Sequence, residues 1–251
     1  MDGSIETVVL LGALSFAAFT VQTIAGFGAS LVIVGVGSLF LPVSHLVVVA
    51  VALSPIPTGY VLARHHQHID KRLLLHEILP MAGIGVVVSL LFLAPWVSSP
   101  WVKPALGLWI MAGAGYDLLR LVRPDMLVNA RPPSHYARRA WMFAAGLVHG
   151  MFATGGPALV YALSKTDIPK SALRSTLMTV WLTLNVGLVV TFLLNGRLDI
   201  AGLQHIALVL PAVALAIGVG EWAHHRIPSR PFKLLVSFLL VGTGAVLMAS
   251  S

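Results

Sequence analysis

The residues best suited to bind a ligand lie at two glycine-bearing breaks between apolar runs. The first break is Gln22 to Ser30, Q-T-I-A-G-F-G-A-S, and the second is His149 to Pro157, H-G-M-F-A-T-G-G-P. A break exposes backbone N–H groups, and a helix that begins after it directs the positive end of its dipole to the same point. These features together favour an anion site. For either break alone, close helix packing by small residues is the alternative.

Side chains at the breaks add polar groups to this predicted site. Ala29 and Pro157 complete its two walls, and His149, within an apolar run, either takes up and releases a proton or stays neutral with its hydrogen bonds satisfied. A proton is therefore the ion that we consider as a partner of this site. The candidate substrate-binding residues at the breaks are Gln22, Gly26, Phe27, Gly28, Ser30, His149, Thr154, Gly155 and Gly156.

Four further candidates lie in the segments that follow the breaks. Two prolines next to Ser54 free backbone carbonyls, so Ser54 and Thr58 either satisfy those carbonyls or face a substrate. Asn185 is either a hydrogen-bonding link between helices or a ligand contact. Arg174 would supply a fixed positive charge with bidentate geometry for an oxyanion. Alternatively, Arg174 is a positively charged anchor at the cytoplasmic end of a helix.

Other chemistries have little support in the sequence. The chain has no cysteine, so thiolate metal sites, disulfides and thiol nucleophiles are excluded. The histidines at 65–68 and 224–225 lack carboxylates at ligand spacing, and a solvated loop is the plainer interpretation. No Ser-His-acid grouping stands out. We therefore expect no enzyme activity, no cofactor and no metal.

Composition indicates that these residues are positioned by membrane helices. Hydrophobic residues make up 57% and charged residues 10% of the chain, whereas soluble domains are about 25% charged. No run alternates with period two, which favours helices over a barrel. The acidic N-terminus lacks a signal-peptide n-region, so the first run is expected to remain as a membrane helix. The apolar segments lie at about residues 7–25, 27–41, 46–63, 73–94, 102–119, 140–153, 156–164, 172–194, 201–221 and 232–249.

The two halves of the chain are similar when they are offset by 127 positions. This offset places Gln22 on His149, Gly28 on Gly155 and Pro42 on Pro169. Five segments per half is an odd number, so the second copy must have the inverted topology. We predict a first membrane repeat at 1–120, a cytoplasmic linker at 121–138 and a second membrane repeat at 139–251.

The distribution of Lys and Arg along the chain supports this inverted topology. The net charge is +7, and the Lys and Arg residues cluster in the connections near 64–72, 120–139, 165–174 and 226–233. With these connections in the cytoplasm, both termini lie outside. This pattern is typical of a membrane protein, and no nucleic-acid partner is expected.

In the second half, the two apolar segments on either side of the break are too short for two full membrane crossings. A break exposed to lipid would leave N–H and C=O groups unsatisfied, so it must line protein or a water-filled cavity. The prediction is an all-α integral membrane protein of two inverted-topology repeats. Each repeat has a broken or re-entrant helix pair, and the pairs meet near the membrane midplane. The number of full spans stays open between about six and ten.

These motifs resemble the TauE/SafE family of membrane anion transporters, often called sulfite exporters. The resemblance rests on A-G-F-G at 25–28, G-L-V-H-G-M-F-A-T-G-G-P at 146–157, P-x-x-x-L-R at 169–174 and the basic connection after the third helix. Family members often carry three adjacent glycines where this chain has Phe27-Gly28-Ala29. The resemblance implies movement of sulfite, sulfoacetate or related organosulfur and organic anions across the cytoplasmic membrane.

We therefore expect a multi-pass protein of the cell inner (cytoplasmic) membrane. It would work as a secondary transporter that carries a small anion by alternating access. The alternatives are an anion channel, a membrane-embedded enzyme and a metal-ion carrier. The direction of transport and the choice between monomer and homodimer stay open.

Overall fold

The computed structural model describes residues 5–123, 133–163, 168–226 and 229–249, and every regular element in these ranges is a helix. Half of the predicted linker 121–138, residues 124–132, lies outside the described residues. Six described helical stretches are long and apolar enough to cross a membrane. They are Ile5–Ala25, Val43–His68, Lys71–Leu93, Val102–Val122, Ser171–Leu194 and Gly202–His224. The prediction of an all-helical membrane protein is confirmed.

The helices follow the predicted segments closely. The first half contains α1 (Ile5–Ala25), α2 (Ala29–Gly37), α3 (Val43–Leu53), α4 (Pro55–His65), α5 (Lys71–Leu73), α6 (Leu79–Val88) and α7 (Val102–Val122). Single turns at His66–His68, Leu74–Ile78, Ser89–Leu93 and Ala94–Trp96 join or extend these helices. The second half contains α9 (His135–Phe152), α10 (Gly156–Leu163), α11 (Lys170–Leu194), α12 (Ile200–Arg226) and α13 (Ser229–Ala249).

Two of the described helices, α2 and α10, do not continue into a longer helical stretch and are far too short to cross a bilayer. α2 has 9 residues and α10 has 8, which corresponds to about 12–14 Å of helix against roughly 30 Å of hydrocarbon. Each begins directly after a glycine-bearing break, and each follows a longer helix, α1 or α9. The breaks are therefore turns inside the protein.

One residue at each break, Gly26 and Ala153, ends the preceding helix in a similar way. Gly26 and Ala153 both have left-handed φ values, 88° and 57°. Each ends the preceding helix with a bond from its N–H to a carbonyl, that of Gln22 or His149, at 2.7 Å in both cases. Ala153 is the single non-glycine residue with positive φ in the described ranges. A residue of this conformation commonly ends a helix.

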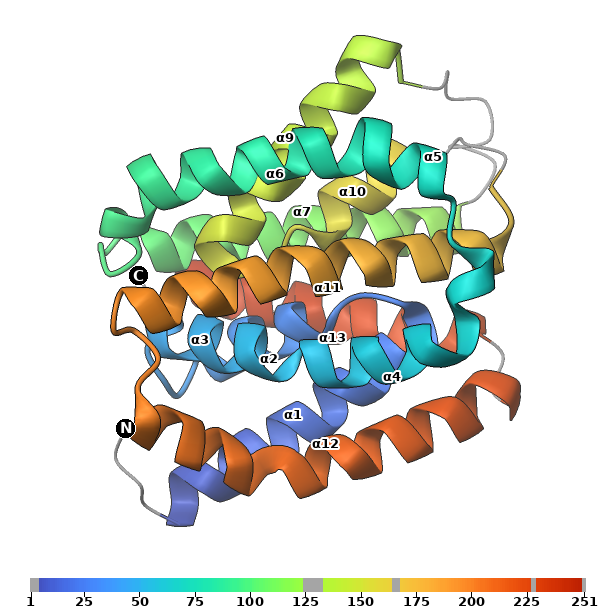
Figure 1. The fold of residues 1–251 in the computed structure, drawn as a ribbon. Coiled ribbons are helices and arrows are strands. Elements are labelled where there is room, and N and C mark those ends of the chain that lie inside the picture. Colours follow the sequence, from blue (N-terminus) through green and yellow to red (C-terminus); the bar gives the residue numbers. More distant parts are fainter. Residues whose placement is uncertain (1–4, 124–132, 164–167, 227–228, 250–251) are drawn as a thin grey trace.

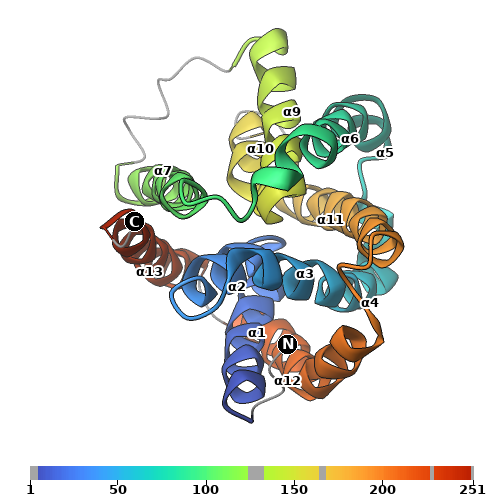
Figure 2. The ribbon, with the colours of Figure 1, turned by 90° about the vertical axis from the view of Figure 1, so that its left-hand side faces the viewer.

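Long helices pack in pairs around a central layer formed by α2, α3, α10 and α11 (Figures 1 and 2). The pairs are α1 with α12, α6 with α9 and α7 with α13. Small residues allow close approach, as at Gly146 of α9, where an added Cβ would lie 1.9 Å from the carbonyl oxygen of Ala82 in α6. Both termini lie at one end of the bundle (Figure 1).

Candidate functional site

A cavity lies where the two breaks meet in the middle of the bundle. Phe27 of the first break packs against Gly156 of the second, with 3.2 Å between its Cδ2 and the position of an added Cβ. The cavity has about 20 Å³ of free volume, which is enough for about one water molecule. Nine of the predicted residues line it: Gln22, Phe27, Gly28, Ser30, Ser54, His149, Thr154, Gly156 and Asn185.

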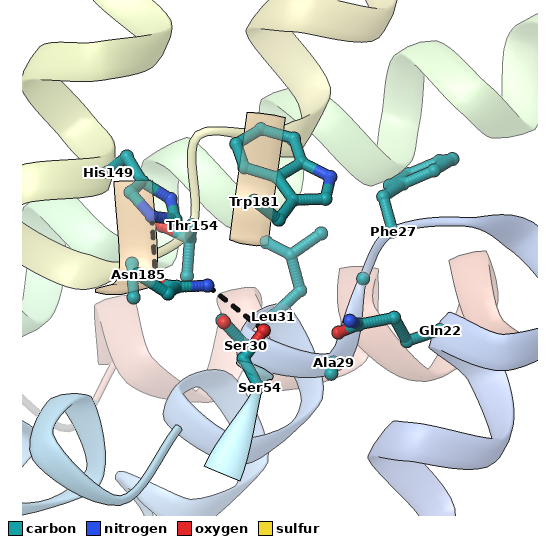
Figure 3. A pocket seen from close by; sticks show the side chains of 13 residues that line it. Gln22, Phe27, Ala29, Ser30, Leu31, Ser54, His149, Thr154, Trp181 and Asn185 are labelled. Carbon is teal, nitrogen blue, oxygen red and sulfur yellow. Dashed lines mark hydrogen bonds between the residues drawn. The ribbon is translucent and has the colours of Figure 1, made fainter. Parts of the chain in front are cut away.

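A chain of buried polar side chains crosses one wall of the cavity (Figure 3). His149 Nε2 lies 3.1 Å from Asn185 Oδ1, and Asn185 Nδ2 donates to Ser54 Oγ at 2.9 Å. All three residues are at most 2% exposed. Because the Asn185 oxygen only accepts, the Nε2 atom of His149 carries its proton in this arrangement. The chain joins the α3–α4 junction, α9 and α11 in one network.

Trp181 covers the histidine. Its ring stacks on the His149 ring with 5.1 Å between centroids and 27° between planes. The indole Nε1 of Trp181 is buried and has no hydrogen-bond partner among the described residues, and the same is true of Gln22 Nε2, Thr154 Oγ1 and His149 Nδ1. Since buried polar groups are normally paired, four unused hydrogen-bonding groups around one cavity indicate a site for a ligand.

Helix α2 adds backbone donors to this set. Gly28, at φ 106°, precedes the helix and provides no side-chain cap. The first N–H groups of any helix lack an intrahelical acceptor, and here Ala29, Ser30 and Leu31 carry them beside the cavity. Helix α10 begins at Gly156 on the opposite side, although Pro157 has no N–H to offer. Helix α2 therefore offers more backbone N–H donors to the cavity than α10 does.

Neighbouring helices hold the ends of the breaks. An NH2 group of Arg174 donates to the carbonyl of Thr23 and lies 3.3 Å from Glu221 Oε1, while His224 Nδ1 lies 3.1 Å from the carbonyl of Ile24. These contacts satisfy the last carbonyls of α1. The indole of Trp109 donates to the carbonyl of Thr154 at 3.1 Å and so fixes the second break to α7.

Comparison with known proteins identifies the family. The family described as "Sulfite exporter TauE/SafE" matches residues 11–247. The chain belongs to this family. A curated relative from Cupriavidus necator, named "Probable sulfite/organosulfonate exporter TauE", is 26% identical over 239 residues, which cover 90% of this chain and 88% of the relative. No solved structure matches the chain.

Membership of the TauE/SafE family agrees with the helical architecture. The family consists of membrane transporters, and six candidate spans make this member a multi-pass membrane protein of the cytoplasmic membrane. In the described part of the chain, no three His, Asp or Glu side chains come together as a metal site.

Four predicted site residues of this TauE/SafE protein do not line the cavity. Gly26 packs against the Arg174 side chain, and Arg174 itself is paired as described above. The hydroxyl of Thr58 donates to the carbonyl of Ser54 within its own helix. Gly155 lies behind the cavity wall, where an added Cβ would be 2.2 Å from the carbonyl oxygen of Ala145. None of the described residues that line the cavity is a Lys, Arg, Asp or Glu.

The sequence prediction also left out three residues that line the cavity: Leu31, Ala153 and Trp181. Trp181 is the most informative of them, because it combines an unused donor with the stack on His149. One signal was available: the offset of 127 places Trp181 on Ser54, a residue that was predicted.

Proposed function

We propose that this TauE/SafE protein is a secondary transporter for a small sulfur-containing anion, sulfite or an organosulfonate, and that the anion binds in the cavity between the breaks. The observation that carries the proposal is the set of unused groups there: Trp181 Nε1, Gln22 Nε2, Thr154 Oγ1 and the first N–H groups of α2. The printed name of the Cupriavidus necator relative supports the choice of substrate class.

The chemistry of the lining favours an anion that is held by neutral donors. Indole and amide N–H groups donate only, and the positive end of α2 adds to their attraction for negative charge. No carboxylate among the described lining residues opposes an anion. Arg174 does not serve as the counter-charge, since it is paired with Glu221. Substrate charge would instead be stabilised by dipoles, in a site that water reaches only when it opens.

We further propose that the two halves are inverted repeats that alternate access to this cavity. The matched hydrogen bonds at Gly26 and Ala153 support the repeat. The packing of the long helices supports the repeat as well. Counted by apolar segments, the first segment of each half packs on the fourth segment of the other half: α1 packs on α12, and α9 packs on α6. The matched helices α3 and α11 begin at opposite ends of the bundle (Figure 1). The small cavity volume fits a closed state that must widen to admit an anion.

The basic connections place the end opposite the termini in the cytoplasm under this proposal. His149 is the proposed carrier of a coupling proton. Its ring keeps a second nitrogen, Nδ1, outside the bond to Asn185, so the ring can take up a proton without breaking that bond. A proton on His149 would also attract the anion.

Counterflow in liposomes tests the proposal. Liposomes with the purified protein and preloaded unlabelled sulfite should accumulate radiolabelled sulfite transiently, and the initial rate should saturate. A channel would equilibrate the label without accumulation, and that result would assign the chain to the alternative function. Ethanesulfonate in place of sulfite then separates the two proposed substrate classes.

Trp181→Phe is the most direct variant for this assay, because it keeps the stack on His149 and removes one N–H donor. Loss of a hydrogen bond to a charged ligand costs about 1.5–3 kcal/mol, so the half-saturating concentration should rise roughly 10- to 150-fold. Trp222→Phe is the matched control, since Trp222 is 54% exposed on α12. Equal behaviour of the two variants would contradict the proposed site.

A further inference from the structure

A second, larger pocket lies at the end of the bundle that carries both termini. Its volume is about 340 Å³, within the range of roughly 300–1,000 Å³ that is typical of ligand sites. Residues from the first turn of α3, the turn after α6 and the connection from α11 to α12 form its walls. Those used below are Ser44, Ser98, Phe192, Asn195 and Arg197. The pocket, unlike the central cavity, has room for an organosulfonate.

Arg197 supplies this pocket with a positive charge. The turn after α11 is fixed by Gly196, at φ 67°, and by a 2.9 Å bond from the Arg197 N–H to the carbonyl of Phe192. The guanidinium then lies over the Phe192 ring, 4.5 Å from its centroid. Stacking of this kind orients the planar group and leaves its N–H edges available for a ligand.

The Arg197 charge has no partner among the described residues. The two ion pairs found there involve Arg138 with Glu77 and Arg174 with Glu221. Asp199, two residues away, uses its carboxylate to accept the N–H of Gly202 at 2.7 Å, at the start of α12. Burial lowers the pKa of the Arg197 guanidinium from its ordinary value. A partly desolvated cation of this kind gains more from an anion than a solvated one.

Neutral donors surround the same space. Ser44 stands in the first turn of α3, whose N-cap, Pro42, provides no side-chain cap. The hydroxyl of Ser98 and the amide of Asn195 also line the pocket, and none of its described lining residues carries a carboxylate. One planar cation, two hydroxyls, an amide and a helix start form a donor set suited to three oxygens that share one negative charge.

We propose that this pocket is a second binding site for an R–SO3⁻ headgroup, at one mouth of the transport path. The choice of a sulfonate rests on the proposed function. Two helices run from this pocket to the central cavity. Along α3, Ser44 of the pocket and Ser54 of the cavity are separated by a rise of about 15 Å. Along α11, Asn195 of the pocket and Asn185 of the cavity are separated by the same rise. Both helices thus connect the mouth to the central polar network. An anion held at Arg197 would be concentrated outside the central cavity until that cavity opens.

The absence of cysteine from the chain makes a direct test possible. Ser98→Cys introduces a single thiol into the pocket of the full-length protein. Its modification rate is measured in detergent with sulfonatoethyl methanethiosulfonate, which is anionic, and with the trimethylammonium-ethyl analogue, which is cationic. Adding Arg197→Gln should lower the anionic-to-cationic rate ratio about tenfold. Ethanesulfonate should slow labelling when Arg197 is present and not when it is replaced. Sulfite is avoided because it cleaves disulfides.

Lys103→Gln is the matched control, because it removes one positive charge from an exposed residue outside the pocket lining at the start of α7. It should leave both the ratio and the protection unchanged. An equal change in the two charge variants, or no protection by ethanesulfonate, would overturn the proposal. Protection only by phosphatidylglycerol vesicles would assign the pocket to a lipid phosphate and would overturn the substrate site as well.

Asn185→Leu separates this proposal from the proposed function. That variant disrupts the central network and should abolish counterflow, while ethanesulfonate still protects the thiol at position 98. If counterflow of sulfonates fails in the unmodified chain but protection persists, the pocket stands and the central transport proposal falls. If counterflow is normal and the thiol shows no Arg197-dependent protection, only the proposal for the second site falls.

Discussion

Gly155→Ala tests whether the second break must lie against α9. An added Cβ would be 2.2 Å from the carbonyl oxygen of Ala145 and 3.0 Å from the Cβ of His149. A helical carbonyl cannot rotate away, so the break and α9 must separate by roughly 1 Å. Overpacking of this kind costs about 1–3 kcal/mol. The displacement also moves His149 relative to Asn185, so transport should fall together with stability.

The assay is thermal unfolding of the purified protein in detergent. For a chain of this length, each kcal/mol corresponds to about 2–4 °C in Tm, so we expect a decrease of roughly 2–12 °C. The control is Gly187→Ala on α11, where nothing lies within 4 Å of the added Cβ and a gain of about 0.5–1 kcal/mol is expected from reduced backbone freedom. Equal Tm values for the two variants would refute the packing argument.

Two other substitutions test the surroundings of the cavity by the same unfolding assay. Asn185→Leu should lower the free energy of unfolding by about 2–4 kcal/mol, because both of its buried partners lose a hydrogen bond, whereas Thr183→Val, on the exposed face of the same helix, should cost less than about 0.5 kcal/mol. Similar losses would argue against the buried network. Arg174→Met should cost about 1–3 kcal/mol through Glu221 and the end of α1, yet leave stabilisation by a bound anion intact; loss of that stabilisation would place Arg174 in the site.

Much of the helix arrangement follows from local sequence. Glycines mark both breaks, and apolar run lengths predict the helices to within a few residues. The offset of 127 also matches two residues that both have positive φ, Gly26 and Ala153. It does not reveal why a given glycine is needed. Gly28 adopts φ 106°, whereas the matched Gly155 is required by the space beside Ala145. These two matched glycines therefore depend on backbone conformation in one case and on packing in the other.

Side-chain partners across the fold are harder to predict. The pairing of Arg174 with Glu221 depends on how α12 is rotated against α11, and an apolar helix does not reveal that rotation. Trp181 lies in an apolar run, and the sequence of such a run does not distinguish a tryptophan that faces a cavity from one that faces lipid. Asn185 left two roles open in the sequence: in the structure its two hydrogen bonds link neighbouring helices, and the residue also lines the cavity. The volume of a cavity likewise depends on packed side chains rather than on any motif.

Binding of an anion to the central cavity is the measurement that tests this account most directly. Purified protein is unfolded thermally with sulfite and with ethanesulfonate, where a ligand at 100 times its Kd should stabilise by about 2.7 kcal/mol. We predict that at least one anion stabilises, that Trp181→Phe weakens the effect at least tenfold, and that Arg197→Gln leaves a stabilising effect in place. Stabilisation that disappears with Arg197→Gln but persists in Trp181→Phe, or none with either anion, would contradict the central site.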